Sequence, residues 1–193
     1  MHVGMGVIFQ GEGEGRTDRN VYRNELRFGD LAEPLGFESL WGVEHHFTDY
    51  TMCPDVLQFL TYMAGRTTRA QLGSMVVVLP WHDPIRVAEE VAMLDNISGG
   101  RLILGLGRGA GKVEFDGFRL SMDESRQRFV GCDELCSERF QFGKRFVACF
   151  ATQRLNRVLY NRHFPATLQE PFGCKLHTIL RHYAEHDELR AGV

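Results

Sequence analysis

The apolar run MVVVL, at residues 75–79, constrains the fold more than any other stretch of this 193-residue chain. A strand with one wet face alternates apolar and polar residues, whereas a strand covered on both faces is apolar throughout. Residues 71–79 are therefore predicted to form a central strand of a parallel sheet. Consecutive parallel strands need a crossover connection, usually a helix, so the rest of the chain must supply helices.

The first 130 residues show this alternation. The β-type runs are at 3–9, 39–43, 71–79 and 101–106, and the amphipathic helical segments are at 24–35, after Pro54 and after Pro84. Asp83 is expected to cap the helix that begins at Pro84. This order predicts an α/β fold, either an open doubly wound sheet or a (β/α) barrel. In both folds, ligands bind at the carboxyl ends of the strands.

Composition narrows the class of protein. The chain has 44% hydrophobic and 24% charged residues and a formal net charge of -3, which gives no reason to expect nucleic acid or a membrane surface as a partner. No apolar run is long enough to span a bilayer. The N-terminal residues lack the pattern of a secretory signal, and five cysteines without a CxxC pair suit a reducing compartment. We therefore expect a cytoplasmic protein.

Glu44, His45 and His46 follow directly after the second predicted strand. Adjacent residues on an extended chain point to opposite sides, so His45 and His46 cannot easily bind one ion, and no metal is expected. One imidazole could face a pocket as a general base or hydrogen-bond donor, with Glu44 or the other histidine anchoring the strand end. A pair of surface histidines is the alternative.

The glycine-rich stretch GLGRGAG, at residues 105–111, follows the fourth predicted strand. A dinucleotide-binding fingerprint belongs to the first βα unit, so this string does not indicate one. We interpret it as a backbone that approaches a ligand closely, with Arg108 offering its charge to a phosphate group. The alternative is a glycine turn with an exposed arginine. Cys53 is interpreted as a buried apolar residue rather than a nucleophile.

Several ordered motifs together resemble a known family. The stretches GFESLWGVEHHFTDY, GSMVVVLPWHDPIRVAEEVAMLDNISGGRLILGLGRG, and EFDGF followed by ESRQRF are similar to the bacterial luciferase-like flavin-dependent monooxygenases. The resemblance covers residues 1–130. It implies the first four βα units of an eight-stranded TIM-type barrel, and hence an incomplete barrel.

The resemblance also implies an activity. Enzymes of this family use reduced FMN and O2 to oxidise a small organic substrate, and they receive the FMNH2 from a separate NAD(P)H:flavin reductase. A deazaflavin used for hydride transfer is the alternative cofactor, and a homo- or heterodimer is expected. A non-catalytic flavin-binding or subunit-type protein, associated with a full-length barrel, is the alternative function.

The site residues implied by the resemblance lie at the predicted strand ends. His45 would be the active-site base, and Arg108 would contact the flavin phosphate. A non-prolyl cis peptide between Met75 and Val76 would press on the flavin ring. Gly107 would also lie at the cofactor, where luciferase itself has a reactive cysteine, so light emission is not expected. The side chains expected to line the substrate pocket are Glu44, His46 and His82.

The alternation of strands and helices ends near Val130. Residues 131–193 contain scattered Phe, Arg and Cys, and their Lys and Arg outnumber their Asp and Glu, unlike residues 1–130. We interpret 1–130 as the amino-terminal half of a luciferase-like barrel. We interpret 131–193 as a divergent, poorly ordered tail of a truncated or frame-disrupted relative.

Overall fold

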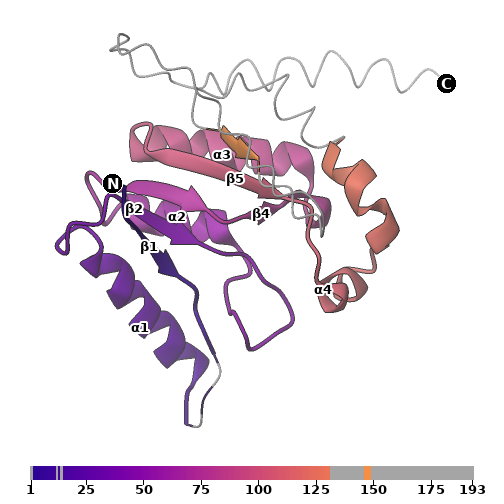
Figure 1. The fold of residues 1–193 in the computed structure, drawn as a ribbon, viewed down its shortest axis with the longest axis horizontal. Helices are drawn as coiled ribbons and strands as arrows, with labels where there is room; N and C mark the ends of the chain where they lie inside the picture. The colour runs from indigo at the N-terminus through magenta and orange to yellow at the C-terminus, as the bar shows by residue number, and fades with distance from the viewer. Residues whose placement is uncertain (1, 12, 14, 131–145, 149–193) are drawn as a thin grey trace.

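The computed structural model describes residues 2–11, 13, 15–130 and 146–148, and it shows one parallel sheet (Figure 1). The strands run β1–β2–β3–β5–β4 across the sheet, and β6 pairs with β5. Every pairing is parallel, as the apolar third strand predicts. The strands are β1 Gly4–Val7, β2 Ser39–Gly42, β3 Gln71–Ser74, β4 Val77–Val78, β5 Leu102–Gly107 and β6 Phe146–Ala148.

Helices connect these strands. The α-helices are α1 Asp18–Leu31, α2 Val56–Ala64, α3 Pro84–Ser98 and α4 Lys112–Gly117, with short 3-10 turns at Leu79–Trp81 and Met122–Glu124. Asp83 accepts hydrogen bonds from two backbone N–H groups at the start of α3, which confirms the predicted cap. In the same way Thr17 caps α1, which begins earlier than its apolar residues predict. No helix in the described ranges has the length and apolar character needed to cross a membrane.

The hydrophobic core lies between the sheet and helices α2 and α3, which pack side by side on one face (Figure 1). Leu40, Leu72 and Leu102 are in register on neighbouring strands and belong to this core. Because side chains alternate along a strand, Trp41 and its neighbour Gly73 face the opposite side. The α/β fold predicted from the sequence is confirmed.

The third predicted strand is interrupted rather than continuous. β3 ends at Ser74, and the chain resumes pairing with β5 only at Val77. In the gap, the Ser74 hydroxyl donates a hydrogen bond to the Gly105 carbonyl and accepts one from the Gly105 N–H, both at 2.9 Å. A side chain therefore replaces the ladder bonds that the backbone does not make, which an apolar run cannot reveal.

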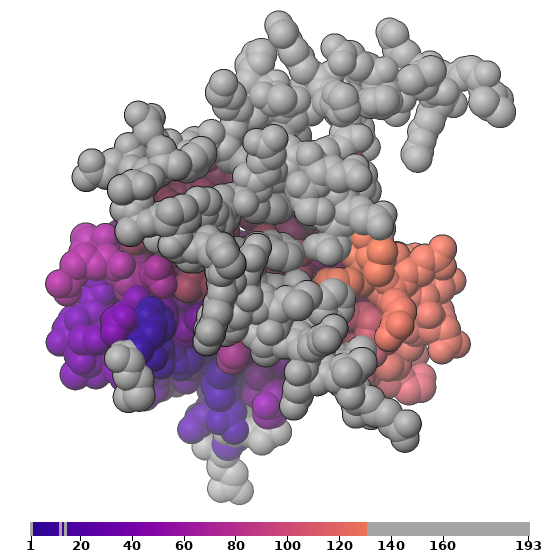
Figure 2. Space-filling model, turned by 45° about the horizontal axis from the view of Figure 1, so that its top comes forward, coloured from indigo at the N-terminus to yellow at the C-terminus, as the bar shows by residue number. Residues whose placement is uncertain are grey.

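The described residues beyond β5 form a lobe that contains α4, and they also form one further strand, β6. α4 and the segment up to residue 130 follow the carboxyl end of β5 and form a lobe on one side of the molecule (orange in Figures 1 and 2). β6, which the sequence pattern did not predict, pairs with the second edge of β5 through three residues, too few to show a periodicity. The rest of the predicted tail, 131–145 and 149–193, lies outside the described residues.

Glu33 holds the turn before β3. Its carboxylate accepts hydrogen bonds from the backbone N–H groups of Thr68, Arg69 and Ala70. Partial burial by itself would raise the pKa of this carboxyl, but these hydrogen bonds outweigh it and lower the pKa below its usual 4.5. The charged form is therefore favoured in the folded protein.

Replacing Glu33 tests this turn. A carboxyl group whose pKa is lower in the folded than in the unfolded protein stabilises the fold at any pH above its unfolded-state pKa. This stabilisation is lost as the pH falls from about 4.5, the usual pKa, through the pKa of the folded protein. Glu33→Ala is expected to lower the free energy of unfolding by about 1–3 kcal/mol at neutral pH. Glu33→Gln keeps one acceptor oxygen but no charge, so urea unfolding should show less acid sensitivity than wild type. An identical acid profile in wild type and Glu33→Gln would contradict this assignment.

Candidate functional site

His45 lies just past the end of β2, and a buried carboxylate holds its ring. The Nδ1 atom of His45 is 2.9 Å from Oε1 of Glu114, a residue in the first turn of α4. The backbone N–H of His46 donates to the same oxygen at 3.1 Å. Two segments far apart in the sequence are thus joined at the carboxyl end of the sheet.

This contact determines which nitrogen of His45 carries the proton. An ionised carboxylate only accepts hydrogen bonds, so Nδ1 of His45 is the donor to Glu114. In the neutral ring, Nε2 then has the lone pair and can accept a proton. The side chain of His45 is 37% exposed, whereas that of Glu114 is 4% exposed. The ring is therefore oriented from inside the protein and accessible from outside.

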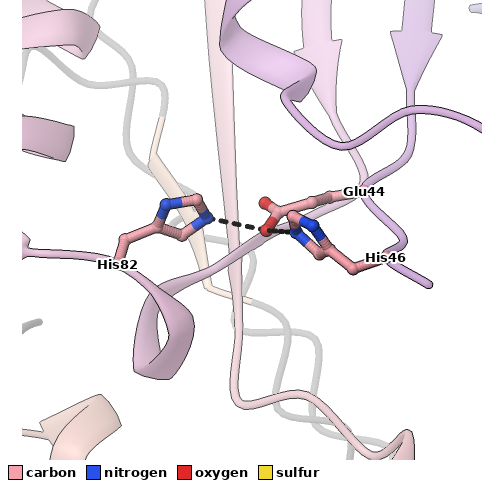
Figure 3. Close-up of side chains that lie close together, drawn as sticks. All are labelled: Glu44, His46 and His82. Carbon is pink, nitrogen blue, oxygen red and sulfur yellow. Dashed lines mark hydrogen bonds and ion pairs between the residues drawn. The ribbon is translucent and has the colours of Figure 1, made fainter. Parts of the chain in front are cut away.

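Glu44, His46 and His82 form a second cluster (Figure 3). One carboxylate oxygen of Glu44, Oε1, is 3.1 Å from Nε2 of His46 and 2.7 Å from Nε2 of His82. The other oxygen accepts a hydrogen bond from the backbone N–H of Val78 at 3.0 Å. Glu44 is buried, and protein groups form hydrogen bonds with both of its carboxylate oxygens.

The negative charge of Glu44 and the positive charge of a protonated His82 stabilise each other. Burial would raise the pKa of Glu44, but hydrogen bonds from His46 and His82 lower it below its usual value. Burial would lower the pKa of His82, but the hydrogen bond and charge of Glu44 raise it. Both pKa shifts favour the charged forms, in which Glu44 is a carboxylate anion and His82 retains its proton more strongly than in water.

Alternation along the extended chain separates the two sites. His45 points to Glu114, while Glu44 and His46, two residues apart, point to the same side and meet His82. This confirms that His45 and His46 face different partners. The sequence interpretation did not identify Glu114 as the support of His45. The only available signal was a glutamate placed beside Phe115 soon after the glycine-rich stretch.

Aromatic rings surround His46. The rings of Phe118 and Trp81 contact it edge to face, with centroids at 4.7 Å and 5.3 Å. Trp81 and Phe118 also stack on each other at 5.8 Å. These rings come from the turn after β4 and from the end of α4, so they hold the imidazole in one orientation and exclude water from its faces.

The predicted cofactor residues occupy neighbouring strand ends. The peptide bond between Met75 and Val76 is cis, the feature that the resemblance placed there, and Met75 is exposed. A Cβ atom on Gly107 would collide with the side chain of Val76, so close packing requires glycine at this position. Arg108 donates from Nη1 to the hydroxyl of the buried Ser125 at 2.9 Å. Contact of any of them with a flavin stays a prediction.

Cys53 contributes backbone rather than thiol chemistry. Its side chain is buried, and burial raises the pKa of the thiol to about 12. Its carbonyl oxygen accepts the backbone N–H of His45 at 3.0 Å. These observations agree with its interpretation as a small apolar residue, because a thiol with so high a pKa is a poor nucleophile.

Polar side chains at the carboxyl ends of parallel strands are the arrangement found in enzymes built on (β/α) barrels. The profile of the luciferase-like monooxygenases matches residues 1–144, and the chain belongs to this family. The match extends past Val130, where the regular alternation ends. The fold is that of the family's TIM-barrel enzymes, of which these residues cover a part.

Individual relatives agree with the family assignment. The chain is 31% identical over 123 residues to the oxygenase component of the flavin-dependent trigonelline monooxygenase of Acinetobacter baylyi, and 33% identical over 110 residues to the alkanal monooxygenase alpha chain of Photorhabdus laumondii. The matched regions are 64% and 57% of this chain. They are 34% and 31% of those proteins, so the chain spans about a third of their length.

A solved structure is also matched over only part of its length. Monooxygenase RslO1 from Streptomyces bottropensis superposes with a TM-score of 0.68 and 37% sequence identity, over 72% of this chain and 43% of that one. The described sheet thus corresponds to part of a monooxygenase barrel.

Proposed function

We propose that the chain carries the proton-handling half of a two-component flavin-dependent monooxygenase site, which uses reduced FMN and O2 to oxidise a small organic substrate. The observation that carries this proposal is the His45–Glu114 pair at the carboxyl edge of the sheet. Both named relatives are monooxygenases, and one of them is the oxygenase component of a flavin-dependent monooxygenase. An oxygenase component needs a partner reductase, which we propose to be an NAD(P)H:flavin reductase.

The residues at the neighbouring strand ends have chemistry that fits FMN. The guanidinium group of Arg108 suits a phosphate, since it offers several N–H donors and a permanent positive charge. Met75 offers an exposed apolar side chain to a planar ring system, and Gly107 leaves the backbone accessible. Bound reduced flavin would supply the electrons that activate oxygen. The chain itself would bind and orient the reactants.

The role of His45 in this scheme is proton transfer at Nε2. Glu114 holds Nδ1, which fixes the ring and stabilises the imidazolium that forms when Nε2 takes a proton. Positioned general bases of this kind contribute about 10²–10⁴-fold to the rate. Glu114 acts through His45 and is a positioning residue.

The second candidate function is a flavin-binding subunit without turnover, associated with a full-length barrel. The two candidates differ in one measurable way: both bind flavin, and only the first forms product when FMNH2, O2 and substrate are supplied.

Arg108→Ala tests the phosphate site. We expect the Kd for FMN to rise about 10- to 100-fold, the loss typical of one charge-assisted contact. The Kd for riboflavin, which has no phosphate, should hardly change. Both are measured by fluorescence titration. Ser125→Ala is the matched variant, because it removes a hydrogen-bond partner of Arg108 but leaves the charge.

Two outcomes would count against this assignment. Equal losses for FMN and riboflavin would show that Arg108 acts through the fold. An unchanged FMN affinity would show that the phosphate binds elsewhere. Titration with a deazaflavin separates the cofactor alternatives, since tighter binding of the deazaflavin than of FMN would favour hydride transfer.

A further inference from the structure

We propose that Glu44, His46 and His82 bind a divalent transition-metal ion such as Zn²⁺. The expectation that this chain binds no metal rested on His45 and His46, which do face different ways. The structure groups a different set: Glu44, His46 and His82 each offer one ligand atom, and these atoms lie within 4.8 Å of one another. These three residues are the side chains expected to line the substrate pocket, and none of them is among the proposed flavin contacts Met75, Gly107 and Arg108.

The ligand set has a recognisable chemistry. Two imidazoles and one carboxylate form the protein ligands of many zinc enzymes and, with open positions, of non-haem iron sites. Zn²⁺ binds such atoms at about 2.0–2.2 Å, so tetrahedral ligand atoms are about 3.3 Å apart. Oε1 of Glu44 is already 2.7 Å and 3.1 Å from the two Nε2 atoms. The ligand atoms of the two histidines lie within 4.8 Å of each other, so a rotation of His82, the more exposed imidazole, toward His46 would bring all three atoms to this spacing.

The surroundings hold two of the ligands in position. The backbone N–H of Val78 binds the second oxygen of Glu44, which directs Oε1 toward the histidines. Trp81 and Phe118 pack edge to face against the ring of His46 and restrict its rotation. Such outer contacts orient the ligands of a metal site and strengthen binding. The side chain of His82 is 28% exposed, and that of His46 12%, so an ion and a water ligand can approach beside His82.

The local charge also favours a cation. The carboxylate of Glu44 is in direct contact with His82, and the charges of Asp55, at the start of α2, and of Glu90, on α3, act on the same imidazole. The three carboxyl groups thus create a negative potential at His82, which a dication would relieve.

The three side chains are already joined by hydrogen bonds. A metal ion would therefore have to replace these hydrogen bonds in order to bind. In the hydrogen-bonded cluster, both Nε2 atoms donate to Glu44. An ion would need a lone pair from each Nε2, so the ring protons must lie on Nδ1 or leave to solvent. The His45–Glu114 contact lies on the other side of the chain and needs no rearrangement.

A titration of the full chain with Co²⁺ tests the proposal. Co²⁺ substitutes for Zn²⁺ and gives visible absorption when it is bound in a low-coordinate site. His82→Gln and His46→Gln each remove an imidazole and retain an N–H donor for Glu44, so the buried carboxylate keeps its partner. We expect wild type to show one equivalent of this absorption, and each variant to bind at least about 100-fold more weakly, since even outer-shell changes cost 10- to 100-fold.

Two controls isolate the site. His2→Gln makes the same chemical change at an exposed histidine that contacts Glu38, and it should bind like wild type. Histidines and cysteines of residues 131–193 are present in every variant, so they cancel in the comparison. Circular dichroism melting shows whether each variant is folded.

Three results would overturn the proposal: no Co²⁺ absorption in wild type, equal absorption in His82→Gln and wild type, or equal losses in His2→Gln and His82→Gln. If the Gln variants do not fold, NMR of wild type decides instead. The Cε1–H signals of the partly buried His46 and His82 should then shift together and saturate at one equivalent of Zn²⁺. If only the signals of exposed histidines shift during the Zn²⁺ titration, the proposed site is refuted. All these measurements use no flavin, so they do not depend on the proposed function.

Discussion

His45→Gln is expected to lower the rate of flavin-dependent substrate oxidation by about 10²–10⁴-fold, with the Kd for FMN within a few-fold of wild type. The variant keeps a polar side chain of similar reach but has no group that takes a proton near neutral pH. Product formation is measured with FMNH2 supplied by a separate reductase and a panel of aldehydes as substrates. This prediction rests on the proposed function.

Glu114 provides the companion measurement. Glu114→Gln leaves an oxygen that accepts from Nδ1 of His45, whereas Glu114→Ala leaves that nitrogen without its partner. We expect the Gln variant to retain more of the rate than the Ala variant, with KM nearly unchanged in both. His2→Gln is the control, because His2 lies away from this contact and pairs with Glu38. A His45→Gln variant with a normal rate would refute the role of His45 as a base.

Gly105→Ala is expected to lower the free energy of unfolding by about 3 kcal/mol, the upper part of the range for overpacked sites. A Cβ atom at this position would collide with the backbone carbonyl oxygen of Ser74. That oxygen belongs to the end of β3 and cannot turn away as a flexible side chain can. The added methyl group would also disturb the Ser74–Gly105 hydrogen bonds.

Gly6→Ala is the matched control for Gly105→Ala. Gly6 lies in β1, and a Cβ atom there has no neighbour within 4 Å among the described residues. Its effect on stability should be within about 0.5 kcal/mol. Urea unfolding monitored by tryptophan fluorescence measures both variants, with the slope m checked for constancy. Equal midpoints for the two variants would contradict the proposed collision.

Local patterns predicted the parts of the fold that depend on local chemistry. The MVVVL run predicted a parallel sheet, which the structure has. The strand expected there is interrupted, since only Val77 and Val78 of the run lie in a strand and Met75 is exposed. Asp83 beside Pro84 predicted the start of α3, because a cap and a first-turn proline act within a few residues. The strand ends at Glu44 and at the glycine-rich stretch were located in the same way.

Other parts required contacts that no pattern encodes. Glu114 meets His45 across 69 positions of sequence, and nothing near Glu114 indicates its partner. The break between β3 and β4 depends on the Ser74 hydroxyl reaching Gly105 on another strand. β6 depends on the available edge of β5 rather than on its own three residues.

The tripeptide Glu44–His45–His46 also limits which sequence changes this strand end can tolerate. Its two histidines reach different carboxylates only because consecutive side chains project to opposite sides. Inserting or deleting one residue between Gly42 and Glu44 would invert this orientation and present each imidazole to the wrong carboxylate. Loop lengths elsewhere can vary, but the count of residues between β2 and this tripeptide cannot change by one.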